Sequence, residues 1–137
     1  MAVYQIELVD SINAVSQLAE FLSESLEKEG VSFEVENALQ LAAEEAAVNI
    51  ITHGYQGAPG LIEVRCTVEE QEVILCICDK APFFNPLSLP TPDIEAGIDD
   101  RRIGGLGVHL IRSLMDEVRY KETEFGNCLI MHKIRKI

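Results

Sequence analysis

Two side chains that could hold a metal ion and assist proton transfer lie four residues apart in a helical pattern. Within residues 32–53, apolar residues recur every three or four positions and place Asn49 on the apolar side and Glu45 at its flank. Side chains at this spacing are neighbours on a helix, so one carboxylate and one amide oxygen can together suit Mg²⁺ and a water. On spacing alone, the alternative is that Glu45 reaches solvent and Asn49 bonds a neighbouring loop.

Other polar features stand at the ends of predicted elements. Asp79 follows the apolar run of residues 73–78, where it can form an Asx turn or accept a hydrogen bond from the exocyclic amine of a base. Residues 104–107, Gly-Gly-Leu-Gly, precede a helical pattern and can either bind phosphate through free N–H groups or act as a hinge. Arg102 brings positive charge to this loop, or pairs with nearby acidic residues.

The elements that must position these residues form a predicted α+β, two-layer sandwich with a mixed, mostly antiparallel sheet and helices on one face. The order of strand, two helices, hairpin, long loop, helix and hairpin lacks the βαβ alternation of a parallel sheet. Predicted helices span residues 11–29, 32–53 and 106–115, and predicted strands span 2–9, 61–68, 73–78, 117–122 and 128–134.

Length and composition predict one domain over residues 1–137, with a proline-rich lid loop at about 80–105. The formal net charge of −12 disfavours nucleic acid and anionic membrane as partners. No apolar run approaches the ~20 residues of a membrane span. The four cysteines lack C-x-x-C spacing and are expected to be reduced, in keeping with a predicted cytoplasmic location.

Taken together, the motifs resemble those of the GHKL, or Bergerat-fold, ATPase superfamily. Glu45-Ala46-Ala47-Val48-Asn49, Asp79-Lys80-Ala81 and Gly104-Gly105-Leu106-Gly107 are similar in order and spacing to its N, G1 and G2 boxes. Over nearly the whole domain the chain looks most like the small anti-sigma-factor serine kinases. The resemblance implies their fold, a mixed sheet over helices, and the ligands ATP and Mg²⁺.

The resemblance also implies roles for single residues. Glu45 would be the general base toward an attacking hydroxyl, Asn49 would coordinate Mg²⁺ at the phosphates, and Asp79 would bind the adenine amino group. The remaining residues implied in nucleotide binding are Ala81, Phe84, Arg102, Gly104, Gly105, Leu106, Gly107 and Val108. Ala81 stands where the superfamily usually has glycine, and its methyl group is expected to narrow the slot for the base.

The function implied by the resemblance is that of an ATP-dependent protein serine/threonine kinase. It would phosphorylate an anti-anti-sigma (STAS-type) partner and sequester a sigma factor, as a homodimer that binds neither nucleic acid nor membranes directly. The acidic balance suits a partner with a basic surface. One alternative is a non-catalytic nucleotide-sensing interaction module. Another is a metal protein using His53, His109, His132 and the cysteines, although these have no recognised ligand spacing.

Overall fold

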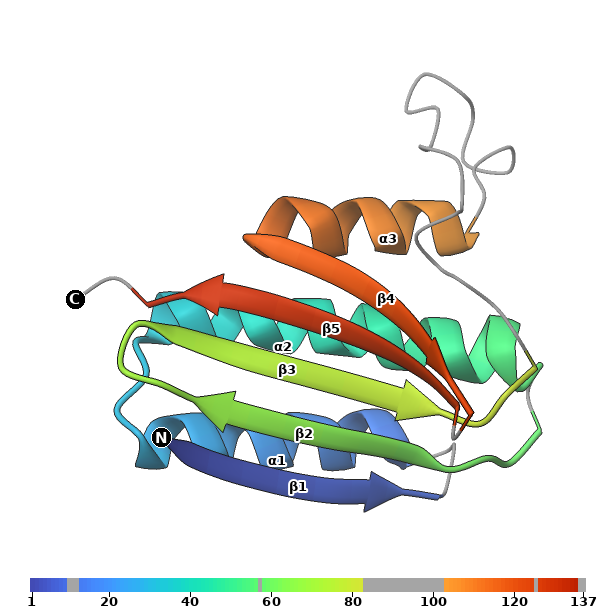
Figure 1. Ribbon diagram of the computed structural model, residues 1–137, viewed down its shortest axis with the longest axis horizontal. Helices are drawn as coiled ribbons and strands as arrows, with labels where there is room; N and C mark the ends of the chain where they lie inside the picture. The colour runs from blue at the N-terminus through green and yellow to red at the C-terminus, as the bar shows by residue number, and fades with distance from the viewer. Residues whose placement is uncertain (10–12, 57, 83–102, 125, 136–137) are drawn as a thin grey trace.

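The structure is an antiparallel five-stranded sheet with helices on one face (Figure 1). The computed structural model describes residues 1–9, 13–56, 58–82, 103–124 and 126–135, with the backbone alone for 103–106. The strands are β1 (Ala2–Leu8), β2 (Ile62–Val68), β3 (Glu72–Asp79), β4 (Glu117–Thr123) and β5 (Gly126–Ile134). They lie in the order β1-β2-β3-β5-β4, and each neighbouring pair is antiparallel. The predicted α+β sandwich is confirmed, with an antiparallel rather than mixed sheet among the described strands.

Three helices cover the sheet: α1 (Ala14–Lys28), α2 (Phe33–Asn49) and α3 (Ile103–Leu114). The boundary between α1 and α2 follows from capping chemistry. Gly30, just past the end of α1, has a φ of +69°, a conformation that glycine adopts at little cost. The Ser32 hydroxyl accepts a hydrogen bond of 3.3 Å from the backbone N of Val35 and so caps α2, at the start predicted for the second helix. The predicted start of the first helix, at residue 11, lies outside the described residues.

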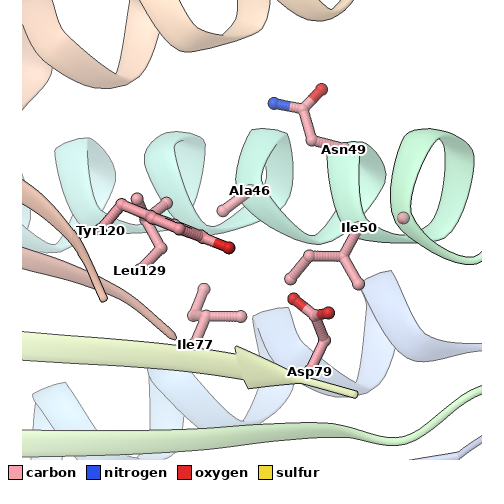
Figure 2. Close-up of a pocket in the computed structure, with 8 residues that line it drawn as sticks. Ala46, Asn49, Ile50, Ile77, Asp79, Tyr120 and Leu129 are labelled. Carbon is pink, nitrogen blue, oxygen red and sulfur yellow. The ribbon is translucent and has the colours of Figure 1, made fainter. Parts of the chain in front are cut away.

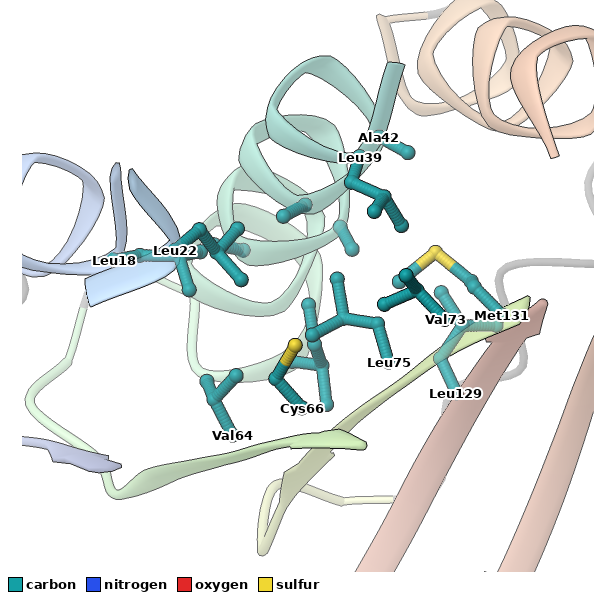
Figure 3. Close-up of a cluster of buried hydrophobic side chains, with 14 of the residues drawn as sticks. Leu18, Leu22, Leu39, Ala42, Val64, Cys66, Val73, Leu75, Leu129 and Met131 are labelled. Carbon is teal, nitrogen blue, oxygen red and sulfur yellow. The ribbon is translucent and has the colours of Figure 1, made fainter. Parts of the chain in front are cut away.

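The core lies between the inner face of the sheet and the helices (Figure 3). Inward residues alternate along the strands, and leucines of α1 meet them from the other layer. Small residues let α2 lie close to the strands. The labelled core residues are Leu18, Leu22, Leu39, Ala42, Val64, Cys66, Val73, Leu75, Leu129 and Met131. This packing fixes α2 over β3, and these two elements carry Glu45, Asn49 and Asp79.

Two helix boundaries differ from those predicted. The predicted second helix of residues 32–53 is divided in the structure. The α-helix ends at Asn49, and the next turn, η1 (Ile50–Gly54), is π-helical, a form that often accompanies functional sites. The third helix begins at Ile103 rather than at residue 106, so the glycines of residues 104–107 lie within its first turns. Their low helix propensity hid this start, because tertiary context can override propensity. Within the described part of the chain, no helix is both long and apolar enough to cross a membrane.

The expectation that all four cysteines are reduced is wrong for two of them. Cys78 and Cys128, which face each other across β3 and β5, form a disulfide with a Cα–Cα distance of 4.1 Å. The sequence hid this pairing because the two residues are 50 positions apart and meet only through the strand register. Cys66 and Cys76 are free. Burial raises the pKa of the Cys66 thiol to about 12, which keeps it protonated and unreactive.

Candidate functional site

Three predicted site residues meet where α3 packs against α2. Asn49 is buried, with 4% of its surface exposed, and Glu45 is half-buried beside it. A Cβ atom added to Gly107 would lie 2.7 Å from Glu45 Oε2, and 3.6 and 3.7 Å from Nδ2 and Oδ1 of Asn49. Glycine at this position therefore allows the α3 backbone to lie directly against both polar side chains. Val108, which follows it, is buried.

The Asn49 amide carries the clearest sign of a missing ligand. Its Nδ2 atom is buried and has no hydrogen-bond partner among the described residues. An unsatisfied buried polar group costs about 1–3 kcal/mol, and native proteins retain few of them without a ligand or an ordered water. The oxygen of the same amide is a type of ligand that Mg²⁺ accepts, so the residues fit a metal-bound phosphate.

A second cluster forms where β3 ends and β5 begins. Oδ1 of Asp79 accepts hydrogen bonds from the Ala81 backbone N at 2.9 Å and from Asn127 Nδ2 at 3.1 Å. Asn127 Nδ2 also donates to the Ala81 carbonyl oxygen at 3.0 Å, and Tyr120 Oη donates to Asn127 Oδ1 at 2.8 Å. Asp79 thus closes the turn through one carboxylate oxygen, and none of the described residues donates a hydrogen bond to Oδ2. An Asx turn at Asp79 and a hydrogen bond from the amine of a base are therefore compatible.

Backbone geometry and burial set the properties of the Asp79 carboxylate. Asp79 pairs with Asn127 in the β3–β5 register. Gly126, with a φ of +140°, lies against the Asp79 carbonyl oxygen, where any side chain would collide. Burial raises the pKa of the Asp79 carboxyl above its ordinary value, and the hydrogen bonds from Asn127 and Ala81 partly oppose that rise. The group is an acceptor when ionised, held in one orientation at the edge of the core.

One pocket connects the two clusters (Figure 2). Both Asn49 and Asp79 line it. In Figure 2, Asn49 points from α2 toward α3, whereas Asp79 points from the end of β3 toward Ile50. The remaining lining residues are mostly apolar: Ala46, Ile50, Gly54, Ile77, Tyr120 and Leu129. A flat, largely apolar ring with one polar edge suits such a wall, with its polar edge toward Asp79.

The structure gives Ala81 a neighbour that makes room for it. Ala81 is buried, and a Cβ added to Gly54 would lie 3.1 Å from the Ala81 Cβ atom. The missing side chain at Gly54 therefore leaves the space beside the Ala81 methyl group. The backbone N of Ala81 bonds Asp79 and its backbone O bonds Asn127, and neither hydrogen bond involves the Ala81 side chain.

The predicted site residues do not all fall within the described side chains. Glu45, Asn49, Gly107 and Val108 come together at one cluster, and Asp79 and Ala81 at the other. The backbone of Gly104, Gly105 and Leu106 belongs to α3. Phe84, Arg102 and most of the predicted lid lie outside the described residues.

Sequence reasoning missed Tyr120 and Asn127. A signal for Asn127 exists: it is a polar residue in the inward-facing series that continues with Leu129 and Met131. Residue 127 falls just before the predicted strand of residues 128–134, and the register that places it opposite Asp79 joins residues 48 positions apart.

Known proteins share this sequence pattern and fold. The sequence model described as the histidine kinase-like ATPase domain matches residues 9–133. The chain is similar to "Serine/threonine-protein kinase BtrW" of Bordetella bronchiseptica, with 31% identity over 68% of this chain and 66% of that protein. It is also similar to "Serine-protein kinase RsbW" of Staphylococcus aureus, with 32% identity over 82% of this chain and 76% of that protein.

A solved structure supports the fold alone. The RsbU and RsbW domains of Rv1364c from Mycobacterium tuberculosis align with all of this chain at a TM-score of 0.69 and 18% identity. The alignment covers 34% of that longer chain. The sheet and helices described above are therefore an arrangement that an experimentally determined relative shares.

Proposed function

The chain belongs to the histidine kinase-like ATPase domain family as an RsbW-like member, and from this premise we propose that it is an ATP-dependent protein serine/threonine kinase. Membership of an ATPase domain family implies ATP binding. The observation that carries the proposal is one pocket with Asp79 at one end and Asn49, beside Glu45 and Gly107, at the other. Phosphoryl transfer requires mainly positioning and stabilisation of charge, which a carboxylate, an amide that can bind Mg²⁺ and closely placed backbone N–H groups can supply.

Each residue has a distinct role in the proposal. Asp79 Oδ2 would accept a hydrogen bond from the adenine amino group, and the Asn49 amide oxygen would ligate Mg²⁺. Bound ATP would supply the phosphoryl group, with Mg²⁺ offsetting the phosphate charge. Glu45 would orient the attacking serine hydroxyl and accept its proton as the hydroxyl oxygen becomes bonded to the γ-phosphorus, while the bond from that phosphorus to the bridging oxygen breaks and ADP leaves. Glu45 is half-buried, so an incoming side chain can reach it.

The protein substrate in this proposal is an anti-anti-sigma (STAS-type) protein, and the sequestered partner is a sigma factor. The support is similarity to RsbW-type kinases together with a net charge of −12, which favours a basic partner surface. The predicted homodimer, cytoplasmic location and Mg²⁺ requirement remain predictions.

Phosphotransfer tests the catalytic half of the proposal. The full chain, Mg²⁺ and labelled ATP are mixed with candidate STAS-type proteins, and transfer of label is followed by electrophoresis. Glu45→Gln should lower the transfer rate by about 10²- to 10⁴-fold, because it removes a general base, while ATP affinity changes little. Glu44→Gln is the matched control, since Glu44 is the exposed neighbour on α2, and it should transfer normally.

The outcomes separate this proposal from the non-catalytic alternative. Equal rates for Glu45→Gln and wild type would remove Glu45 from the mechanism. ATP binding by the wild type without transfer to any STAS-type protein would favour the nucleotide-sensing module. Calorimetric titration of ATP into the wild type and into Asp79→Ala checks the site itself, and Asp79→Ala should bind at least about tenfold more weakly.

A further inference from the structure

The base-binding end of the pocket contains a polar network that the proposed catalytic chemistry does not use. Asn127 has 5% of its surface exposed and is the second residue of β5, directly opposite Asp79. Its amide makes three hydrogen bonds of 3.1 Å or less: two donated by Nδ2 to Asp79 Oδ1 and Ala81 O, and one accepted by Oδ1 from Tyr120. These bonds use both protons of the amide nitrogen.

The network admits only one orientation of the Asn127 amide. Turning the amide by 180° would set its oxygen against the Asp79 carboxylate and the Ala81 carbonyl, which are both acceptors. In the observed orientation the Tyr120 hydroxyl donates to the amide oxygen and adds a third hydrogen bond. Tyr120 therefore holds Asn127, and Asn127 in turn holds Asp79.

The orientation of Asp79 decides what the pocket can accept. Its Oδ1 is occupied by Ala81 N and Asn127 Nδ2, so Oδ2 is the oxygen left for a ligand. An ionised carboxylate oxygen accepts hydrogen bonds and cannot donate them. The rest of the wall is mostly apolar and discriminates weakly between purines of the same shape.

We propose that Asn127, held by Tyr120, is a positioning residue that fixes the Asp79 carboxylate as a pure acceptor and so makes the pocket select a six-amino purine over a six-oxo purine. This inference rests on the proposed ATP-binding function and concerns base selection at the same site. A six-oxo base would bring an acceptor against Oδ2 and leave both groups unpaired, which is costly in a buried site.

The test compares the dissociation constants of ATP and inosine triphosphate, which differ in the group at the six-position of the base and in the protonation of the ring nitrogen beside it. Titrations use the full chain as wild type, Asn127→Ala and Tyr120→Phe. The wild type should prefer ATP by about 10²-fold or more. Asn127→Ala should reduce this preference at least about tenfold, and Tyr120→Phe about threefold, because each releases the carboxylate.

Matched controls separate positioning from general damage. Asn37 is exposed on α2, and Tyr4 on β1 donates its hydroxyl proton to Glu29, away from the pocket lining. Asn37→Ala and Tyr4→Phe should keep the wild-type preference. A purely structural loss would weaken both nucleotides equally and leave their ratio unchanged. If Asn127→Ala fails to fold, Tyr120→Phe, which keeps the ring, carries the comparison.

The outcomes are distinguishable from those of the proposed function. A wild type that binds neither nucleotide overturns the proposed function and this inference with it. A wild type that prefers ATP, with an unchanged preference in Asn127→Ala and Tyr120→Phe, overturns the inference and leaves ATP binding intact. A lowered preference in both variants, with unchanged controls, establishes Asn127 and Tyr120 as determinants of base selection.

Discussion

At the scale of single residues, the candidate site depends on which buried polar groups have hydrogen-bond partners and which do not. Asn49 has a buried donor without a partner among the described residues, whereas Asn127 has every donor paired. The first arrangement leaves capacity for a ligand, and the second holds a neighbouring carboxylate in place. Two asparagines of similar burial thus have different expected roles because of what surrounds them.

Asp79 should show a trade-off between stability and binding. Its pKa is raised in the folded state, so its contribution to the free energy of unfolding is present below its ordinary pKa and is lost as pH rises through the raised value. The asparagine in Asp79→Asn does not ionise, so this variant does not lose stability in this way as pH rises. The variant should therefore become more stable relative to the wild type between about pH 3 and about pH 7, while its ATP affinity falls.

Urea unfolding of both proteins at the two pH values measures this difference, and calorimetry measures the affinity. Tyr55 and Lys80, which lie near Asp79, are unchanged in the comparison. A stability difference that does not vary with pH would show that Asp79 titrates alike in the folded and unfolded chains.

At the scale of elements, glycines determine how closely backbones approach the site. Gly107 lets α3 lie against Glu45 and Asn49, and Gly126 lets β5 begin against the Asp79 carbonyl. The two positions differ in what a side chain would meet. At Gly107 it would meet the flexible end of a glutamate, and at Gly126 it would meet backbone.

Gly107→Ala should therefore impair transfer without unfolding the protein. The added Cβ displaces Glu45 Oε2, and α3 gains helix propensity, so the free energy of unfolding should change by less than about 1 kcal/mol. The transfer rate should fall at least about tenfold, because the base loses its position. Denaturant unfolding and the label-transfer assay together check this, and a normal rate would show that Glu45 tolerates displacement.

Gly126→Ala is the contrasting change. Its φ of +140° is unfavourable for any other residue, and the Cβ would collide with the Asp79 carbonyl oxygen. We expect a loss of more than about 2 kcal/mol in the free energy of unfolding. Thermal and urea denaturation measure it. A variant as stable as wild type would mean that the β5 turn rearranges freely.

The sequence predicted the elements well because local patterns specify them. The β-forming runs at residues 61–68 and 73–78 and the start of the second helix at Ser32 each depend on a few neighbouring residues, and the structure confirms them. The predicted start of α3 was wrong because glycines have a low helix propensity. Packing against α2 stabilises the helix there nevertheless. Asn127 and the disulfide were missed because both depend on strand register, which no local pattern sets.

At the scale of the whole molecule, the sheet combines a covered face with a face that carries the disulfide. Cys78 and Cys128 directly adjoin Asp79 and Asn127 in sequence, and side chains alternate between faces along a strand. The disulfide and the contact between Asp79 and Asn127 therefore lie at neighbouring residue pairs of β3 and β5, on opposite faces of the sheet.

Reduction should lower global stability. The bond closes a loop of 50 residues, and loss of such a constraint typically costs about 2–4 kcal/mol. Urea unfolding with and without a dithiol reductant measures the difference. The double variant Cys78→Ser, Cys128→Ser should have the lower stability and no response to reductant. A wild type with equal stability in both conditions would show that the bond adds nothing.

Association with a basic partner should depend on salt. With a net charge of −12, the affinity for such a partner should fall as ionic strength rises from about 0.05 M to about 0.5 M, because screening shortens the range of attraction. Titrations at several salt concentrations measure the slope. Affinity that does not change with salt would exclude electrostatic attraction as the main source of binding.

The aromatic residues give the pocket an optical property. The chain has three tyrosines and no tryptophan, so its intrinsic ultraviolet fluorescence comes from tyrosine alone. Tyr120 lines the pocket, and the Tyr55 hydroxyl accepts a hydrogen bond from the Lys80 backbone N, one residue past Asp79. With Tyr4→Phe removing the third emitter, ligand entry can be followed by emission intensity without any attached dye.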